Sequence, residues 1–270
     1  MIEDAPAALF LGELSDPWVA EIADAMPGKT VRLAHGSTPG EDELGSVEAA
    51  AVIVVHCAIL GPREGEALRL LKERDGTAPP RLVLCIGPHV RSLDLERWAG
   101  VADVVLPEAT ASETIARHVG TWPRPRVARP AITVIGGAFE CRRVLADMCL
   151  RAGYAATAYA TWDDAPLAPL AIWDVPVLED DWDRVLRDKS ARREVVAILG
   201  FADRATVARA RAAGATACLD NTCEPADLAF VLDRIATRLA MDPPHPVPPA
   251  PKTAMRVARP PAVADPGRNP

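Results

Sequence analysis

The residues best placed for chemistry follow apolar runs that predict buried strands. Asp174 follows the run 170–173, and His56 follows the run 50–55. Open α/β sheets bind ligands at the carboxyl ends of their strands, so both residues are candidate site residues. A carboxylate is costly to bury unpaired, which favours a role for Asp174, although it could equally cap the loop before Pro176. A lone histidine at such a place is more often a hydrogen-bonded structural residue.

Two glycines and two cysteines form the other patterns with chemical meaning. Gly136 and Gly137 lie between a predicted strand and a helix, where backbone amides can bind an anion. The pattern is neither a dinucleotide fingerprint nor a phosphate loop, so a tight turn is the simpler interpretation. Cys218 and Cys223 have no second Cys or His pair nearby in sequence, and we expect no metal there. No cofactor is predicted.

The elements that position these residues are clearest in the second half of the chain. The apolar run 195–199 predicts a strand, and the Ala- and Arg-rich segment 203–213 predicts a helix that ends at Gly214. A second strand over 215–219 and a helix that begins at Pro225 follow. Alternating strands and helices predict a parallel sheet with right-handed crossovers.

Both halves of the chain show this alternation. The strands 82–86 and 195–199 align at an offset of 113 residues, and the next strand of each half aligns at the same offset, which predicts an internal repeat. The expected strands are 7–11, 30–34, 50–55, 81–86 and 102–106, then 131–135, 154–159, 170–173, 195–199 and 215–219. We therefore expect two α/β domains, residues 1–120 and 131–240, joined by the Pro- and Arg-rich linker 121–130.

The remaining composition limits the classes of function. Ten of the 26 prolines lie in the last 30 residues, so a disordered tail is predicted for 241–270, with partner docking as the alternative to a solubilising role. The net charge of -7 argues against nonspecific nucleic-acid binding. The acidic amino terminus and the absence of an apolar run of about 20 residues predict a cytoplasmic protein that does not enter membranes.

Part of the second half carries a family resemblance. The residues that carry it are 202–221 (ADRATVARARAAGATACLDN), 224–228 (EPADL), Val144, Leu145, Leu150, Gly153 and Tyr154. On these residues, the second half resembles a response-regulator receiver domain. The resemblance covers about 110 residues of this half, and it covers the first half mostly by analogy. It implies two flavodoxin-like, three-layer αβα domains with parallel five-stranded sheets in the strand order 2-1-3-4-5.

A phosphorylatable receiver needs an acidic pair after its first strand, an aspartate after the third, a hydroxyl after the fourth and a lysine after the fifth. The acidic pair holds a divalent cation, and the cation and the lysine neutralise charge on the transferred phosphoryl group. In the second half Gly136 and Gly137 replace the acidic pair, Leu199 the hydroxyl and Asn221 the lysine. Only Asp174 matches, as a vestigial phosphoacceptor.

The first half departs from the pattern in the same way. His56 occupies the aspartate position, Ile86 the hydroxyl position and Pro107 the lysine position, while Glu13 could be a remnant of the acidic pair. Phe201 falls where receivers often place an aromatic that rotates on activation, although a ring at a strand end is more often plain core. Both halves are therefore interpreted as degenerate receivers.

Two classes of function follow. The first is a non-phosphorylatable pseudo-receiver, not an enzyme, that acts through contacts with a protein partner of unidentified kind; a homodimer is compatible with it. The alternative is a small two-domain α/β enzyme or nucleotide-binding protein, for example glycosyltransferase-like, that uses the cleft between the domains. Direct nucleic-acid binding is not expected, since no helix-turn-helix pattern follows residue 240.

One region of the second half is both acidic and aromatic. We interpret it either as a solvated loop face or as a protein-docking surface. Its residues are Trp162, Asp163, Asp164, Trp173, Glu179, Asp180, Asp181, Trp182 and Asp183.

Overall fold

The structure is a computed structural model, and it describes residues 8–27, 30–33, 50–73, 79–98, 100–122, 127–200 and 202–241, the backbone alone for 30–33. Phe201 and the predicted tail from residue 242 onward lie outside the described residues. Within the described part, no helix is both long and apolar enough to cross a membrane.

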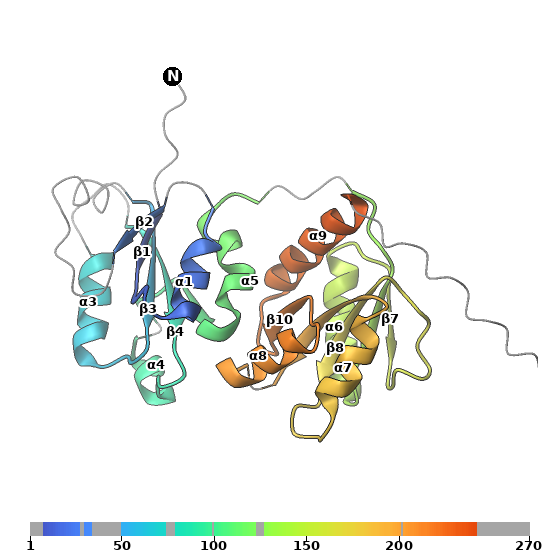
Figure 1. Ribbon diagram of the computed structural model, residues 1–270. Helices are drawn as coiled ribbons and strands as arrows, with labels where there is room; N and C mark the ends of the chain where they lie inside the picture. The colour runs from blue at the N-terminus through green and yellow to red at the C-terminus, as the bar shows by residue number, and fades with distance from the viewer. Residues whose placement is uncertain are drawn as a thin grey trace, which may run out of the picture.

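The first half of the chain forms a parallel five-stranded sheet. Its elements, in chain order, are β1 (Ala8–Leu11), α1 (Pro17–Asp24), β2 (Thr30–Leu33), β3 (Val52–Cys57), α3 (Pro62–Lys72), β4 (Arg81–Ile86), α4 (Ser92–Trp98), β5 (Val104–Pro107) and α5 (Glu108–Val119). The strand order is β2-β1-β3-β4-β5 (Figure 1). Val54 of β3 is in register with Phe10 of β1 and Val83 of β4, at the centre of the sheet.

The second half repeats this architecture. Its elements are β6 (Ile132–Ile135), α6 (Phe139–Arg151), β7 (Ala156–Tyr159), β8 (Leu170–Val175), α7 (Trp182–Ser190), β9 (Glu194–Leu199), α8 (Arg204–Ala212), β10 (Ala217–Asp220) and α9 (Pro225–Met241). The sheet order is β10-β9-β8-β6-β7, which is again 2-1-3-4-5 within the half. The expected fold class, two flavodoxin-like, three-layer αβα units with parallel five-stranded sheets, is confirmed.

Helices cover both faces of each sheet because the strands are apolar on both sides. Along β9, Val195, Ala197 and Leu199 contact one core while Val196 and Ile198 contact the other. In the second sheet α6 and α9 cover one face, and α7 and α8 cover the other. In the first sheet α1 and α5 cover one face, and α3 and α4 the other.

Two helix ends follow the predicted pattern. Gly153 follows α6, and Gly214, at which the sequence predicts a helix end, follows α8; their left-handed φ values are 89° and 94°. Residues other than glycine rarely adopt this backbone conformation, which is common just after the end of a helix.

Several element boundaries differ from those expected. The helix predicted over 112–119 begins at Glu108, four residues earlier. Its start has no capping side chain; instead Glu108 bonds Arg204, which lies 96 residues away in the sequence. A contact of that range leaves no local signal. β8 and β3 also run further than expected, so Asp174 and His56 lie inside their strands, each one residue before the strand ends.

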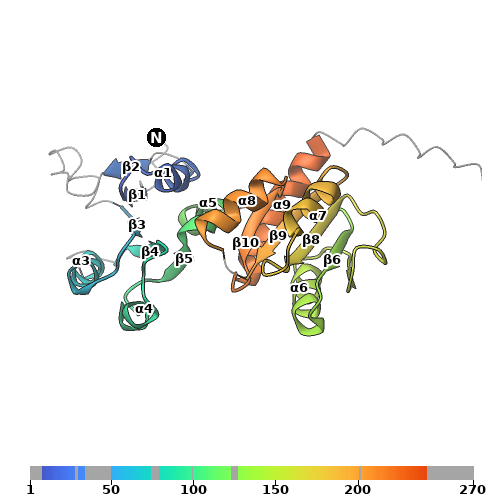
Figure 2. The ribbon, with the colours of Figure 1, turned by 60° about the horizontal axis from the view of Figure 1, so that its bottom comes forward.

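The two sheets lie side by side, with α5 between them. This helix contacts α8, β10 and α9 of the second half, and Figures 1 and 2 show it at the boundary in both views. Ala109 of α5 belongs to the core beneath α7 and α8, and Ala116 packs against the core beneath α6 and α9. The apolar cores thus continue across the boundary. The division into domains at 121–130 stays a prediction, since 123–126 lie outside the described residues.

Candidate functional site

Asp174 lies at the carboxyl edge of the second sheet, between β6 and β9. It is in register with Ile198 of β9. A Cβ atom added at Gly136, which follows β6, would lie 3.2 Å from the Asp174 Cβ and 3.3 Å from the Arg142 Cβ. Such contacts are tighter than ordinary packing. A side chain at position 136 would therefore press on Asp174 and Arg142, so their close approach, rather than conformational freedom, favours glycine there.

The Asp174 carboxylate is half-buried and uncompensated. Within the described part of the chain it makes no hydrogen bond and no ion pair. Burial raises the pKa of the Asp174 carboxyl, because a charge loses hydration there and gains no partner. Among the described residues, no cation or donor bonds this carboxylate and favours its ionised form.

On the β9 side of Asp174, the ends of β9 and β10 carry neither a hydroxyl nor an amine at the positions that the resemblance singles out. Leu199, the last residue of β9, is fully buried in the core beneath α7 and α8. Asn221 follows β10, is exposed, and donates its backbone amide to the Leu199 carbonyl at 3.2 Å. The side chains at the positions singled out by the resemblance are thus an apolar group and a neutral amide.

Gly136 and Gly137 form no obvious anion cradle. The Gly136 amide donates to the Tyr159 carbonyl at 3.2 Å, so it is already used within the sheet. Arg142 Nη1 donates to the carbonyls of both glycines, at 3.1 Å and 3.0 Å. Neither glycine has a left-handed φ, and a Cβ added at Gly137 would meet nothing within 4 Å. The backbone here thus presents carbonyl oxygens to the guanidinium group of Arg142, and it offers no free amide at Gly136 for an anion.

His56 of the first sheet is the start of a chain of charged groups. Its Nε2 lies 2.5 Å from Oε2 of Glu108, and both side chains are buried. The other carboxylate oxygen of Glu108 accepts from Arg204 of α8, whose Nη2 lies 2.6 Å from Oδ2 of Asp16. Burial opposes ionisation of Glu108, but the hydrogen bonds from His56 and Arg204 outweigh it and lower its pKa to about 2. His56, at the position where a receiver has its phosphoacceptor, is thus linked through Glu108 to Arg204 of the second half.

A second chain of the same composition lies at the other end of α5. His118 Nε2 is 3.0 Å from Asp227 Oδ1, and Arg117 bonds both Asp227 and Glu224 at 2.7 Å. Burial raises the pKa of Asp227, yet the bonds from His118 and Arg117 more than offset this and lower it overall. Sequence reasoning missed both chains because their bonds join residues 52 to 188 positions apart in the sequence.

Arginines of the second half complete the boundary. Arg211 of α8 bonds Glu21 of α1 at 2.9 Å and lies over the Trp18 ring, 5.4 Å from its centre. Arg234 of α9 donates to the Glu113 carbonyl at 3.0 Å. Arginine suits such contacts because its planar head bonds carboxylates and stacks on aromatic rings at once. The boundary between the halves thus combines these polar contacts with the apolar packing of Ala109 and Ala116.

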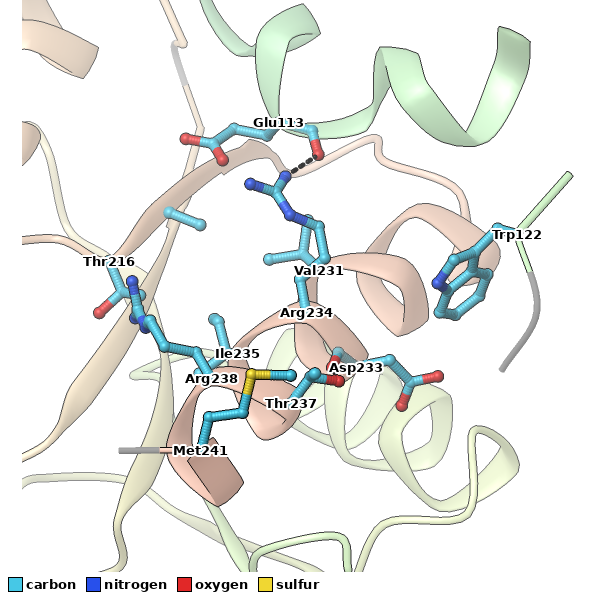
Figure 3. Close-up of a pocket in the computed structure, with 11 residues that line it drawn as sticks. Glu113, Trp122, Thr216, Val231, Asp233, Arg234, Ile235, Thr237, Arg238 and Met241 are labelled. Carbon is cyan, nitrogen blue, oxygen red and sulfur yellow. Dashed lines mark hydrogen bonds between the residues drawn. The ribbon is translucent and has the colours of Figure 1, made fainter. Parts of the chain in front are cut away.

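A groove of about 470 Å³ lies along this boundary (Figure 3). Glu113 and Trp122 line one wall, and α9 supplies most of the other. Its two carboxylates already have partners: Glu113 bonds Arg211 at 3.4 Å, and Asp233 accepts from the Tyr154 hydroxyl at 2.5 Å. Both carboxylates among the described residues that line the groove thus already have a hydrogen-bond partner.

The cysteines are thiols in their folded environments. Burial raises the pKa of Cys218 and of Cys223 to about 12, so neither forms a thiolate near neutral pH. Among the described residues no group of three or more metal-binding side chains converges.

Solved structures similar to this chain include receiver proteins. A pilus assembly protein (CpaE) from Burkholderia thailandensis is 20% identical over 40% of this chain and 98% of its own, with a TM-score of 0.37. The carboxyl terminus of Escherichia coli RcsC, with a linker region and a phosphoreceiver domain, is 14% identical over 90% of this chain and 98% of its own, with a TM-score of 0.35. A two-component system response regulator/GGDEF domain protein is 16% identical over 86% of this chain and 97% of its own, also at 0.35. Neither a protein-family model nor a curated protein sequence matches this chain.

Proposed function

We propose that this chain is a tandem pseudo-receiver that regulates by protein contact and does not undergo phosphoryl transfer. The observation that carries the proposal is the environment of Asp174. Its carboxylate lacks a cationic or hydroxyl partner in the described part of the chain, and Leu199 and Asn221 stand at the ends of β9 and β10, where a receiver has its hydroxyl and its lysine. An acyl phosphate formed there would have little to neutralise its charge.

The first half supports the same conclusion by a different route. His56 replaces the phosphoacceptor, and Glu108, which bonds it, is held in turn by Arg204 of α8. A phosphoryl group on His56 would displace the buried bond between His56 and Glu108. Through Glu108 it would also disturb the bond to Arg204 that joins the two halves. The structure of the boundary thus favours a fixed scaffold over a switch at this position.

The proposal is tested by incubating the full chain with acetyl phosphate and magnesium. No phosphoryl adduct is expected on the wild-type protein. An adduct that disappears in the Asp174→Asn variant would overturn the proposal, since it would show that the vestigial residue still works.

The alternative, a small enzyme or nucleotide-binding protein, has one feature in its favour, the groove between the halves (Figure 3). Arg234 and Arg238 line it and could attract an anionic ligand, although Arg238 already bonds Glu194 at 2.7 Å. Thermal-shift measurements against nucleotides and sugar nucleotides separate the two cases. A rise of several degrees in the unfolding temperature would favour the alternative.

A further inference from the structure

A cavity of about 530 Å³ opens at the carboxyl edge of the second sheet, on the side away from the first half. The loop after β7, the end of β8 and the helix α7 form its walls. It holds Asp174 together with the acidic and aromatic residues that the sequence singled out. The folding of the chain thus gathers Trp162, Trp173 and Trp182 in one place.

The aromatic part of this cavity is preformed. The rings of Trp162 and Trp173 meet edge to face at 5.6 Å, and Trp182 is almost fully buried against them in the same core. Arginines of the chain itself already stack on two of these rings, Arg193 over Trp162 and Arg209 over Trp182. The indoles of this region therefore accept guanidinium groups, as the negative face of an aromatic ring does.

The charge of the lining is strongly one-sided. Four carboxylates line the cavity against one basic residue, Lys189, whose ammonium lies 3.0 Å from Asp188. Asp174 is the most deeply placed of the four and has no partner within the described part of the chain. The carboxylates that line the cavity are Asp163, Asp174, Glu179 and Asp180.

A second unpaired group belongs to a residue that lines the same cavity. The indole nitrogen of Trp162 is buried and has no acceptor among the described residues. A buried donor without an acceptor destabilises the fold, and a backbone carbonyl of an incoming chain would supply one after a small rotation of the ring. An inorganic cation could not do this, so the unpaired donor favours a polypeptide as the ligand.

We propose that this cavity binds an arginine side chain from a basic segment of a partner protein, with Asp174 as the main anchor. A guanidinium group fits the chemistry because it bonds a carboxylate through two donors, stacks on indole and is more weakly hydrated than an ammonium. The inference rests on the proposed function, since it assigns a docking surface to a protein that acts by contact. The remaining carboxylates at the rim attract the basic segment and set its rate of association.

The test is a calorimetric titration of the full chain with the peptide acetyl-Arg-Arg-Arg-amide at low salt. Saturable one-to-one binding is expected. The Asp174→Asn variant should bind about tenfold more weakly, because it loses the charge of the deepest carboxylate. The Glu96→Gln variant, which removes an equal charge from the exposed surface of α4, should bind like the wild type, and a trilysine peptide should bind several-fold more weakly than triarginine.

Three outcomes would overturn the inference: no saturable binding, wild-type affinity in Asp174→Asn, or an equal loss in Glu96→Gln, which would show binding to the net negative surface alone. Unfolding curves recorded on both variants show that any loss of affinity is not a loss of fold. A negative result in the peptide titration would not contradict the proposed lack of phosphoryl transfer, because the acetyl phosphate experiment tests that property separately.

Discussion

His118 Nε2 lies 3.0 Å from Asp227 Oδ1, across the boundary between the two sheets, and both side chains are buried. Arg117 bonds the same carboxylate oxygen at 2.7 Å. The boundary therefore buries polar groups as well as apolar surface, and bonds such as His118–Asp227 and Glu108–Arg204 join the two halves. Two chains share the order histidine, carboxylate, arginine, carboxylate: His118, Asp227, Arg117 and Glu224, and His56, Glu108, Arg204 and Asp16.

Replacing Glu108 with glutamine should destabilise the protein by about 3 kcal/mol, because it leaves His56 and Arg204 without their shared charge in a buried place. The free energy of unfolding in urea measures this loss. The control is Glu66→Gln, which removes an exposed carboxylate bonded to Arg69 within α3 and should leave the urea midpoint unchanged. Equal stabilities of Glu108→Gln and the wild type would contradict the account of the boundary.

The lowered pKa of Glu108 predicts a loss of stability in acid. A carboxyl whose pKa is lower in the folded than in the unfolded state stabilises the fold above its unfolded pKa, and that contribution disappears as the pH falls through the folded value. For Glu108 this window runs from 4.5 down to about 2. Urea midpoints measured across the window should fall less steeply for Glu108→Gln than for the wild type, whereas parallel curves would show that another group governs the acid transition.

The two halves should unfold as one cooperative unit, since Ala109 and Ala116 of α5 pack into the cores of the second half. Calorimetry should give a single transition whose calorimetric and van't Hoff enthalpies agree. Asp227→Asn should broaden or split it, because Arg117 and His118 would lose their charged partner. Asp147→Asn, which removes an exposed carboxylate on α6, is the control. Two resolved transitions in the wild type would refute the prediction.

Asp174→Asn should stabilise the fold by about 1 kcal/mol near neutral pH, because it removes a half-buried charge that has no partner among the described residues. The pKa of this carboxyl is higher in the folded state, so the folded protein binds the proton more tightly and the penalty is relieved as the pH falls. The difference in unfolding temperature between variant and wild type should therefore narrow in acid. A variant less stable than the wild type at neutral pH would mean that the carboxylate has a partner after all.

The fold was predictable from the sequence because its signals are local. Apolar runs such as 195–199 mark strands buried on both faces, and Gly153 and Gly214 mark helix ends by a conformation that few other residues adopt. The order of strands in each sheet came from the resemblance alone, and the structure confirms it.

The candidate site was predictable only in part. Asp174 and His56 were found because they follow apolar runs. The partner of His56, Glu108, and the Arg204 that bonds Glu108 were not found, since they lie 52 and 148 positions beyond His56 in the sequence. The start of α5 was placed too late for the same reason. Contacts between distant segments decide what a residue at a strand end can do, and a single sequence shows no trace of them.

The most direct test of the account is the intact mass of the full chain after incubation with acetyl phosphate and magnesium, beside a phosphorylatable receiver treated identically. The account predicts a phosphoryl adduct on that receiver and none on this chain, in the wild type or in Asp174→Asn. An adduct on the wild type that is absent from Asp174→Asn would contradict the central claim, because Asp174 would then be a working phosphoacceptor.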